Sequence, residues 1–136
     1  MILQTTLCLT AAAVVINLWL AMRIGRLRYA LKVSVGDGGQ DPIIRRMRAQ
    51  ANFIENAPLT LLLFGLVEAS GVRGALGGGI WLAPLGAVFL IGRVAHAYGM
   101  EDDPRFKAGR GIGMMTTILT QLVLVIVGVL IALGRL

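Results

Sequence analysis

Charged residues are scarce in this chain of 136 residues. They make up 15% of it, and hydrophobic residues make up 57%, whereas a soluble domain is about a quarter charged. The mean hydropathy is +0.79. Residues 1–22, 74–92 and 111–134 contain no Lys, Arg, Asp or Glu. Each stretch is close to the roughly 20 apolar residues that a helix needs to cross a bilayer. The composition excludes an ordinary soluble domain and predicts a membrane protein.

A fourth apolar segment, Ala49–Gly71, is interrupted only by Glu55 and Glu68. We therefore predict one domain over residues 1–136, an all-α integral membrane four-helix bundle. The N-terminus lacks the basic region and cleavage site of a signal peptide, so we expect it to remain as part of the first helix. The expected transmembrane helices are Leu3–Met22, Pro42–Ala69, Ile80–Met100 and Gly111–Leu133.

Cysteine is nearly absent, since Cys8 is the only one. An intrachain disulfide is therefore excluded, and we expect Cys8 to be a small packing residue within the first helix. Aromatic residues make up only 6% of the chain. Of the few acids, Glu68 lies near the outer end of the second helix, where we expect it to reach interfacial water or to pair with Arg73.

Acidic residues are half as common as basic ones, 7 against 13, so the net charge is +6. The basic residues gather around the first and third loops, at Arg23, Arg26, Arg28, Lys32, Arg45, Arg46, Arg48, Arg105, Lys107 and Arg110. By the positive-inside rule these loops are cytoplasmic and both termini lie outside. The basicity therefore reflects membrane topology, with anionic headgroups as counter-charge, and does not indicate binding to nucleic acid.

One polar face stands out on the second expected helix. Arg45, Arg48, Asn52 and Glu55 are spaced by three, four and three residues, so they share one side of a helix. An arginine or acid in the middle of a span costs roughly 2.5–3.5 kcal/mol on insertion scales, so such groups face the bundle interior and find partners. Hydroxyls and amides elsewhere in the spans are expected to join helices: Asn17, Thr116, Thr117, Thr120 and Gln121.

The polar groups gather in the cytoplasmic half of the predicted bundle, and their spacing leaves two interpretations open. In the first they form a structural network, in which Arg48 or Arg93 neutralises Glu55. In the second they form a pocket for a zwitterionic, anionic ligand, with guanidiniums on carboxylates and Glu55 on an ammonium or amide. The residues concerned are Arg28, Arg45, Arg48, Asn52, Glu55, Arg93, His96 and Arg110.

Residues 48–59, RAQANFIENAPL, resemble the signature R-x-Q-x-N-x-x-E-x-x-P-L of the MAPEG superfamily (membrane-associated proteins in eicosanoid and glutathione metabolism). Residues 92–96, GRVAH, are similar to a G-R-x-x-H block of its prostaglandin E synthase and bacterial branches. Arg26-Leu27-Arg28, followed by the glycines of 36–39, resembles bacterial members. With four helices at this length, the resemblance covers nearly the whole chain.

The resemblance implies a homotrimer that binds glutathione between subunits near the cytoplasmic side. By position, Arg28 would meet a glutathione carboxylate or close the pocket, and Glu55 would lie near the γ-glutamyl ammonium. Arg110 aligns loosely with an arginine that stabilises the thiolate, which would attack a lipophilic electrophile arriving from the bilayer. The remaining residues that the resemblance assigns to the glutathione site are Arg48, Gln50, Asn52, Arg93 and His96.

Three positions depart from the family pattern. Met100 stands where eicosanoid branches carry a tyrosine, one turn after His96. Gly111 stands where some members have a serine, and Tyr29 stands where one branch has a second arginine. The glutathione-holding part therefore matches better than the thiol-activating part. This pattern favours a general glutathione transferase or peroxidase over an eicosanoid-specific enzyme. In a bacterial cell we expect such a protein in the inner membrane.

Two other functions remain open. The first is a non-catalytic membrane protein that keeps the fold, which Met100 and Gly111 favour. The second is a small four-helix transporter with Glu55 as its proton-coupling acid. Such transporters tend to hold one acid among aromatics in their first helix, whereas residues 1–22 contain no acid here.

Overall fold

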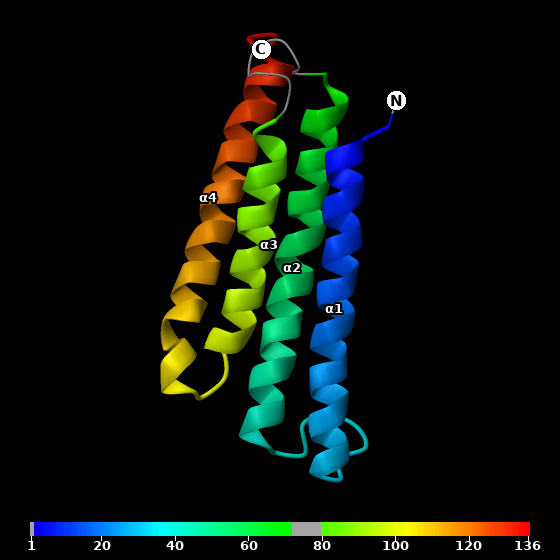
Figure 1. The fold of residues 1–136 in the computed structure, drawn as a ribbon, viewed down its shortest axis with the longest axis vertical. Helices are drawn as coiled ribbons and strands as arrows, with labels where there is room; N and C mark the ends of the chain where they lie inside the picture. Colours follow the sequence, from blue (N-terminus) through cyan, green and yellow to red (C-terminus); the bar gives the residue numbers. More distant parts are fainter. Residues whose placement is uncertain (1, 72–79) are drawn as a thin grey trace.

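The chain forms four long helices that lie side by side in a computed structural model, which describes residues 2–71 and 80–136 (Figure 1). All regular structure in these ranges is helical. Helix α1 begins and helix α4 ends at one end of the bundle. The opposite end carries residues 31–40 and 100–106, and we call it the loop end. The elements are α1 (Gln4–Ala30), α2 (Asp41–Ala69), α3 (Leu82–Gly99), the short 3-10 turn η2 (Pro104–Phe106) and α4 (Lys107–Ala132).

Three segments of the described ranges are long and apolar enough to cross a membrane: Gln4–Ala30, Leu82–Gly99 and Pro104–Ala132. Helix α2 contains the polar segment that precedes Pro58, and it runs along the bundle in contact with α1, α4 and α3. At 29 residues it is about 44 Å long, enough to span the bilayer beside the other three. The predicted all-α membrane bundle is confirmed, although apolar composition alone marks only three of its four helices.

The helices extend beyond their predicted ends mainly at the loop end. Helix α1 continues eight residues past Met22, to Ala30, and α4 begins at Lys107 rather than at Gly111. These extra turns carry several of the arginines, which puts charged residues on helices beyond the apolar spans. Rigid helical backbone, rather than loop, therefore positions Arg28 and Arg110.

The core lies along the faces that the four helices turn toward one another. Phe53 and Phe64 of α2, Phe89 of α3 and Leu124 of α4 are almost completely buried. Helices α3 and α4 pack closely where Gly92 faces Thr116 and where Gly113 faces Gly92 and His96, because a side chain at either glycine would occupy the same space as these atoms. Small residues allow such close helix packing in membranes.

Glu68 fastens α2 to the first turn of α1. Its carboxylate oxygens accept hydrogen bonds from Thr5 N at 2.9 Å, Thr6 N at 2.8 Å and Thr6 Oγ1 at 2.7 Å. The first N–H groups of a helix have no partner within the helix, so Glu68 acts as a cap supplied by another helix. Glu68 was expected to reach interfacial water, and the structure adds a role that this expectation did not include, since both of its oxygens also bind the first turn of α1. The alternative partner, Arg73, lies outside the described residues.

Apolar side chains cover much of the outer surface. Helix α4 exposes Leu119, Leu122 and Ile126, each more than half accessible. Such a surface suits the bilayer or another copy of the chain. Cys8 is also exposed, so the expectation that it packs inside the bundle is wrong for the single subunit.

Candidate functional site

The residues predicted to form the site all lie in the half of the bundle nearer the loop end, but they face different surroundings. Arg110 is exposed at the start of α4, and the others fall into three sets. One pair lines a cavity between α1 and α2. A second pair projects from the outer face of α2. A third group is buried between α2, α3 and α4.

Arg28 and Gln50 line the cavity between α1 and α2, which has a volume of about 360 Å³. Arg28 Nε donates to the carbonyl of Gly36 at 2.8 Å, which fastens this side chain to the loop after α1. Gln50 Nε2 donates to Asn17 Oδ1 at 3.3 Å, and this confirms Asn17 as a contact between helices. The cavity thus offers a guanidinium and an amide above the apolar side chains of Ile24 and Ile54.

Arg48 and Glu55 project from the other side of α2. Seven residues separate them, so they lie about 20° apart around the helix, whereas Gln50 lies about 160° from Arg48. Both are exposed. Within residues 2–71 and 80–136 no ion pair includes Glu55. Its predicted neutralisation by Arg48 or Arg93 is therefore not found in the subunit. The exposed side chains of Arg48 and Glu55 remain available to a ligand.

Asn52 connects this outer face to a buried polar group. Its Oδ1 accepts a short hydrogen bond from Arg93 Nη2, and Arg93 Nη1 donates to Thr117 Oγ1 at 3.0 Å. The Thr117 hydroxyl donates in turn to the carbonyl of Gly113 at 2.8 Å. Arg93 is 1% exposed, so the subunit encloses the guanidinium that was predicted to touch the ligand. The expected role of Thr117 in joining helices is confirmed.

Further along α3 lies His96, the chain's single histidine, which is 3% exposed. Its ring Nδ1 has no hydrogen-bond partner among the described residues. Because Gly113 packs against its β-carbon, the ring lies between α3 and α4 rather than on the surface. An orphaned buried nitrogen is costly, so the described residues leave the hydrogen-bonding capacity of His96 incompletely used.

Arg110, the predicted catalytic residue, is exposed in the first turn of α4, where a helix favours anions. Two of the three positions that depart from the family pattern, Met100 and Gly111, lie nearby in sequence and offer no hydroxyl. Met100 packs against the hydrophobic core, and a side chain at Gly111 would point into open space. Tyr98 packs between Trp19 and Phe106 in tilted ring contacts, with ring centroids 5.5 and 5.4 Å from its own.

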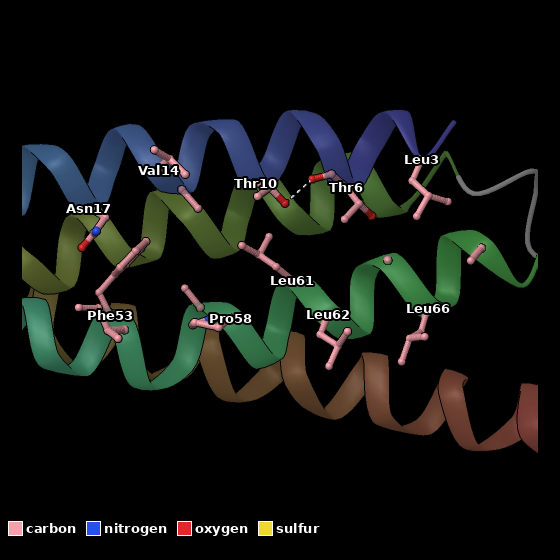
Figure 2. A pocket seen from close by; sticks show the side chains of 15 residues that line it. Leu3, Thr6, Thr10, Val14, Asn17, Phe53, Pro58, Leu61, Leu62 and Leu66 are labelled. Carbon is pink, nitrogen blue, oxygen red and sulfur yellow. Dashed lines mark hydrogen bonds between the residues drawn. The ribbon is translucent and has the colours of Figure 1, made fainter. Parts of the chain in front are cut away.

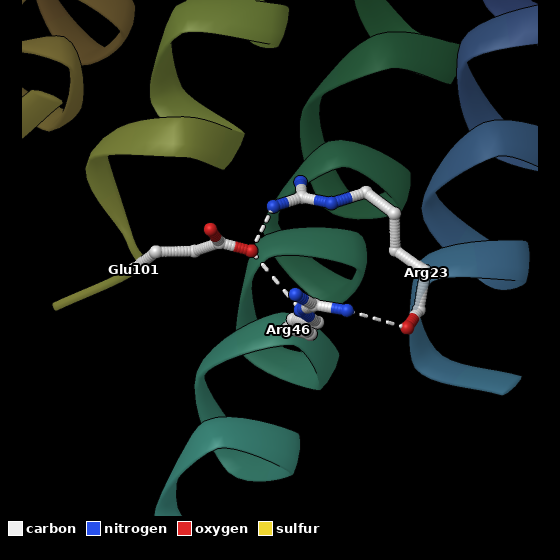
Figure 3. Close-up of polar contacts among 3 residues, drawn as sticks. All are labelled: Arg23, Arg46 and Glu101. Carbon is white, nitrogen blue, oxygen red and sulfur yellow. Dashed lines mark hydrogen bonds and ion pairs between the residues drawn. The ribbon is translucent and has the colours of Figure 1, made fainter. Parts of the chain in front are cut away.

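Sequence reasoning missed an ion cluster at the loop end, formed by Arg23, Arg46 and Glu101 (Figure 3). Glu101 Oε1 contacts Arg23 Nη2 and also accepts from Arg46 Nε at 3.0 Å. Arg46 Nη1 donates to the Arg23 carbonyl at 2.8 Å. One carboxylate thus ties α1 and α2 to the segment after α3. The sequence shows the arginines and the acids, but only the fold decides which acid they share.

The neighbouring acid Asp103 has a local role. Its carboxylate caps η2 by accepting from Arg105 N at 3.0 Å, and it pairs with the Arg105 guanidinium at 2.7 Å. These hydrogen bonds lower the pKa of Asp103 from its ordinary value. The Asp103–Arg105 pair holds the exposed turn that leads into α4, and Arg110 takes no part in it.

An apolar groove runs between α1 and α2 toward the other end of the bundle (Figure 2). It has a volume of about 780 Å³ and is lined by residues that include Val14, Phe53, Pro58 and Leu61. Ile54 lines both this groove and the cavity that holds Arg28, so the two adjoin. Their volumes fall in the range of small-molecule sites. The arrangement provides apolar space beside a cationic end, and the described residues contain no cluster that could hold a metal ion.

Comparison with known proteins agrees with this arrangement. Residues 6–130 match the sequence profile of the MAPEG family. The chain is 30% identical over 102 residues to the inner membrane protein YecN of Escherichia coli strain K12, an alignment that covers 74% of this chain and 72% of that protein. The YecN protein of Escherichia coli O6:H1 strain CFT073 matches equally well. No solved structure matches. The chain, an integral membrane bundle with the RAQANFIENAPL segment on α2, therefore belongs to the MAPEG family.

Proposed function

We propose that this protein is an inner-membrane glutathione transferase or peroxidase that acts on lipophilic electrophiles. The observation that carries the proposal is the outer face of α2, where Arg48 and Glu55 are exposed beside Asn52. A guanidinium, an amide and a carboxylate along one face complement the carboxylates, peptide groups and ammonium of glutathione. The proposed orientation places the loop end in the cytoplasm, because the basic residues gather there.

The site requires a second copy of the chain. Arg28 and Gln50 lie on the α1 side of α2, whereas Arg48 and Glu55 project from nearly the opposite side. One tripeptide cannot contact both faces of a single helix, but the first face of one subunit and the second face of its neighbour can enclose it. A cyclic oligomer, for which we propose the homotrimer, would form one such site at each interface.

The chemistry needs a thiolate, because the thiol of glutathione is mostly protonated at neutral pH, with a pKa of about 8.5 for a free thiol. A guanidinium beside the sulfur favours the thiolate, and Arg110 is the candidate for this role because it is exposed in the first turn of α4. The sulfur then attacks an electrophilic carbon, a carbon–sulfur bond forms, and the leaving group departs with its electron pair. The apolar groove beside Arg28 offers a route by which such a substrate enters from the bilayer.

Calorimetry of the detergent-solubilised protein tests the binding. We expect saturable glutathione binding that Arg48→Ala and Glu55→Gln each weaken by about tenfold or more, the size expected for a lost hydrogen bond to a charged group. Arg26→Ala is the matched control, because Arg26 is also an exposed arginine near the loop end and has no assigned role. Wild-type protein that shows no saturable binding would refute the proposal.

A non-catalytic function is favoured by one observation: neither Met100 nor Gly111 has a side-chain hydroxyl that could donate a hydrogen bond to the sulfur. Conjugation of 1-chloro-2,4-dinitrobenzene separates the two functions, since the reaction forms a carbon–sulfur bond and releases chloride. An enzyme gives a rate above the uncatalysed one that Arg110→Ala lowers. Glutathione binding without any such rate, for this electrophile and for an organic hydroperoxide, would favour the non-catalytic protein.

A further inference from the structure

We propose that Arg93 and Thr117 are positioning residues that orient the side chain of Asn52, so that its amide group donates a hydrogen bond to the bound ligand. The inference deepens the proposed function and rests on it, because the ligand is glutathione. It gives Arg93 a different role from the direct contact that the sequence predicted, and it adds Thr117 on α4 to the functional residues.

The orientation of Asn52 follows from the chemistry of its partner. A guanidinium has five N–H donors and no acceptor, so the atom of Asn52 that faces Arg93 must be the carbonyl oxygen Oδ1. The amide nitrogen Nδ2 is then directed away from Arg93. No hydrogen bond among the described residues uses this Nδ2, since the only other side-chain hydrogen bond at Asn52 runs from Asn56 Nδ2 to the Asn52 backbone carbonyl.

Thr117 fixes Arg93 in the same manner. Its hydroxyl hydrogen is directed to the carbonyl of Gly113, at an oxygen–oxygen distance of 2.8 Å, so a lone pair of Oγ1 faces Arg93 Nη1 at 3.0 Å. Hydrogen bonds arranged in such a chain strengthen one another inside a protein. This series of hydrogen bonds begins at the backbone of α4, passes through Arg93 on α3 and ends at the side-chain amide of Asn52 on α2.

The residues of this hydrogen-bond series differ in burial, and this difference indicates two roles. Arg93 and Thr117 are each 1% exposed, so neither reaches a ligand. Asn52 is only partly buried, and it lies four residues after Arg48 and three before Glu55 on α2. Its Nδ2 is therefore the outermost donor of the hydrogen-bond series, beside the exposed side chains of Arg48 and Glu55 in the proposed site.

A purely structural role explains the arrangement poorly. In the described residues the Arg93 guanidinium has two neutral oxygen partners, and its Nε has none. Burying a charge without an opposite charge costs stability, and a carboxylate at position 52 would compensate it better than an amide. The amide supplies what a carboxylate cannot, which is a donor on the side away from Arg93.

The experiment uses this difference between an amide and a carboxylate. Asn52→Asp keeps an acceptor for Arg93 but removes the donor, so we expect an unchanged or higher melting temperature and glutathione binding at least about tenfold weaker by calorimetry. Asn56→Asp is the matched control, because it adds the same charge one helical turn away, and its glutathione affinity should stay within about threefold of the wild type. Thr117→Val should weaken binding, and Thr117→Ser should restore it.

Each outcome bears on a different statement. Wild-type affinity in Asn52→Asp would overturn this inference while the proposed function stands. Equal loss of affinity in Thr117→Val and Thr117→Ser would also overturn it, because the methyl group rather than the hydroxyl would then matter. Absence of saturable glutathione binding in the wild-type protein would overturn the proposed function and this inference together.

Discussion

At the scale of single residues, the two acids of the apolar part of α2 have opposite roles. Glu68 accepts three hydrogen bonds from the first turn of α1, whereas Glu55 is exposed and pairs with no cation in the part of the chain that the structure describes. One carboxylate stabilises the subunit, and the other is free to contact a ligand. The sequence already placed Glu55 on the polar face of α2 and Glu68 at the outer end, but it did not predict that Glu68 caps α1.

Replacing each acid by its amide should separate these roles. We expect Glu68→Gln to lower the free energy of unfolding by about 1–2 kcal/mol, because a neutral amide caps the N–H groups and the helix dipole of α1 less well. Glu55→Gln should leave stability within about 0.5 kcal/mol, as for exposed positions. Thermal unfolding in detergent measures both. Equal melting temperatures for the two variants would contradict the capping role of Glu68.

At the scale of elements, the seam between α3 and α4 depends on glycines. We expect Gly113→Ala to destabilise the protein by about 1–3 kcal/mol, because the added methyl group would collide with the Gly92 carbonyl and the β-carbon of His96. The matched control is Gly111→Ala in the same helix, where a methyl group meets nothing within 4 Å. This control should be neutral or slightly stabilising, since alanine favours helix. Melting temperatures check both variants, and a loss of stability in Gly111→Ala alone would contradict the assignment of the seam.

The helices themselves could be predicted because the hydrophobic effect requires long apolar segments within a membrane and polar loops between them, and both are visible in the sequence. The start of α4 could not be predicted, since this helix begins before its apolar span, among basic residues that leave the helix boundary ambiguous. Family resemblance singled out the residues of the site, but not their surroundings. Whether Arg93 faces a ligand or the core depends on Asn52 and Thr117, which lie 41 and 24 residues away in sequence.

The same limit applies to Glu101. Residues 101–103 are three consecutive acids, and several arginines precede them, so sequence cannot assign the pairs. In the fold, Arg23 and Arg46 converge on Glu101, while Asp103 turns to Arg105 two residues away. These long-range ion pairs depend on how α1, α2 and α3 are placed relative to one another. The spacing of residues within a single helix gives no information about that placement.

At the scale of the whole molecule, the two faces of α2 make a prediction about assembly. If a site combines Arg28 and Gln50 of one subunit with Arg48 and Glu55 of the next, two defective variants should complement each other. Arg28→Ala with Gln50→Ala removes the first half-site, and Arg48→Ala with Glu55→Gln removes the second. Each variant alone should bind no glutathione at concentrations that saturate the wild type.

Co-expression of the two variants at equal levels should restore binding. In a closed ring of randomly mixed subunits, about one quarter of the interfaces join an intact first half to an intact second half, so calorimetry should find about one quarter of the wild-type number of sites. Their affinity should equal that of the wild type, because each restored site is complete. Mixing the two variants after separate purification, without subunit exchange, provides the control and should restore nothing. A site contained within one subunit would remain defective in every mixed oligomer, so the absence of binding after co-expression would exclude the shared site.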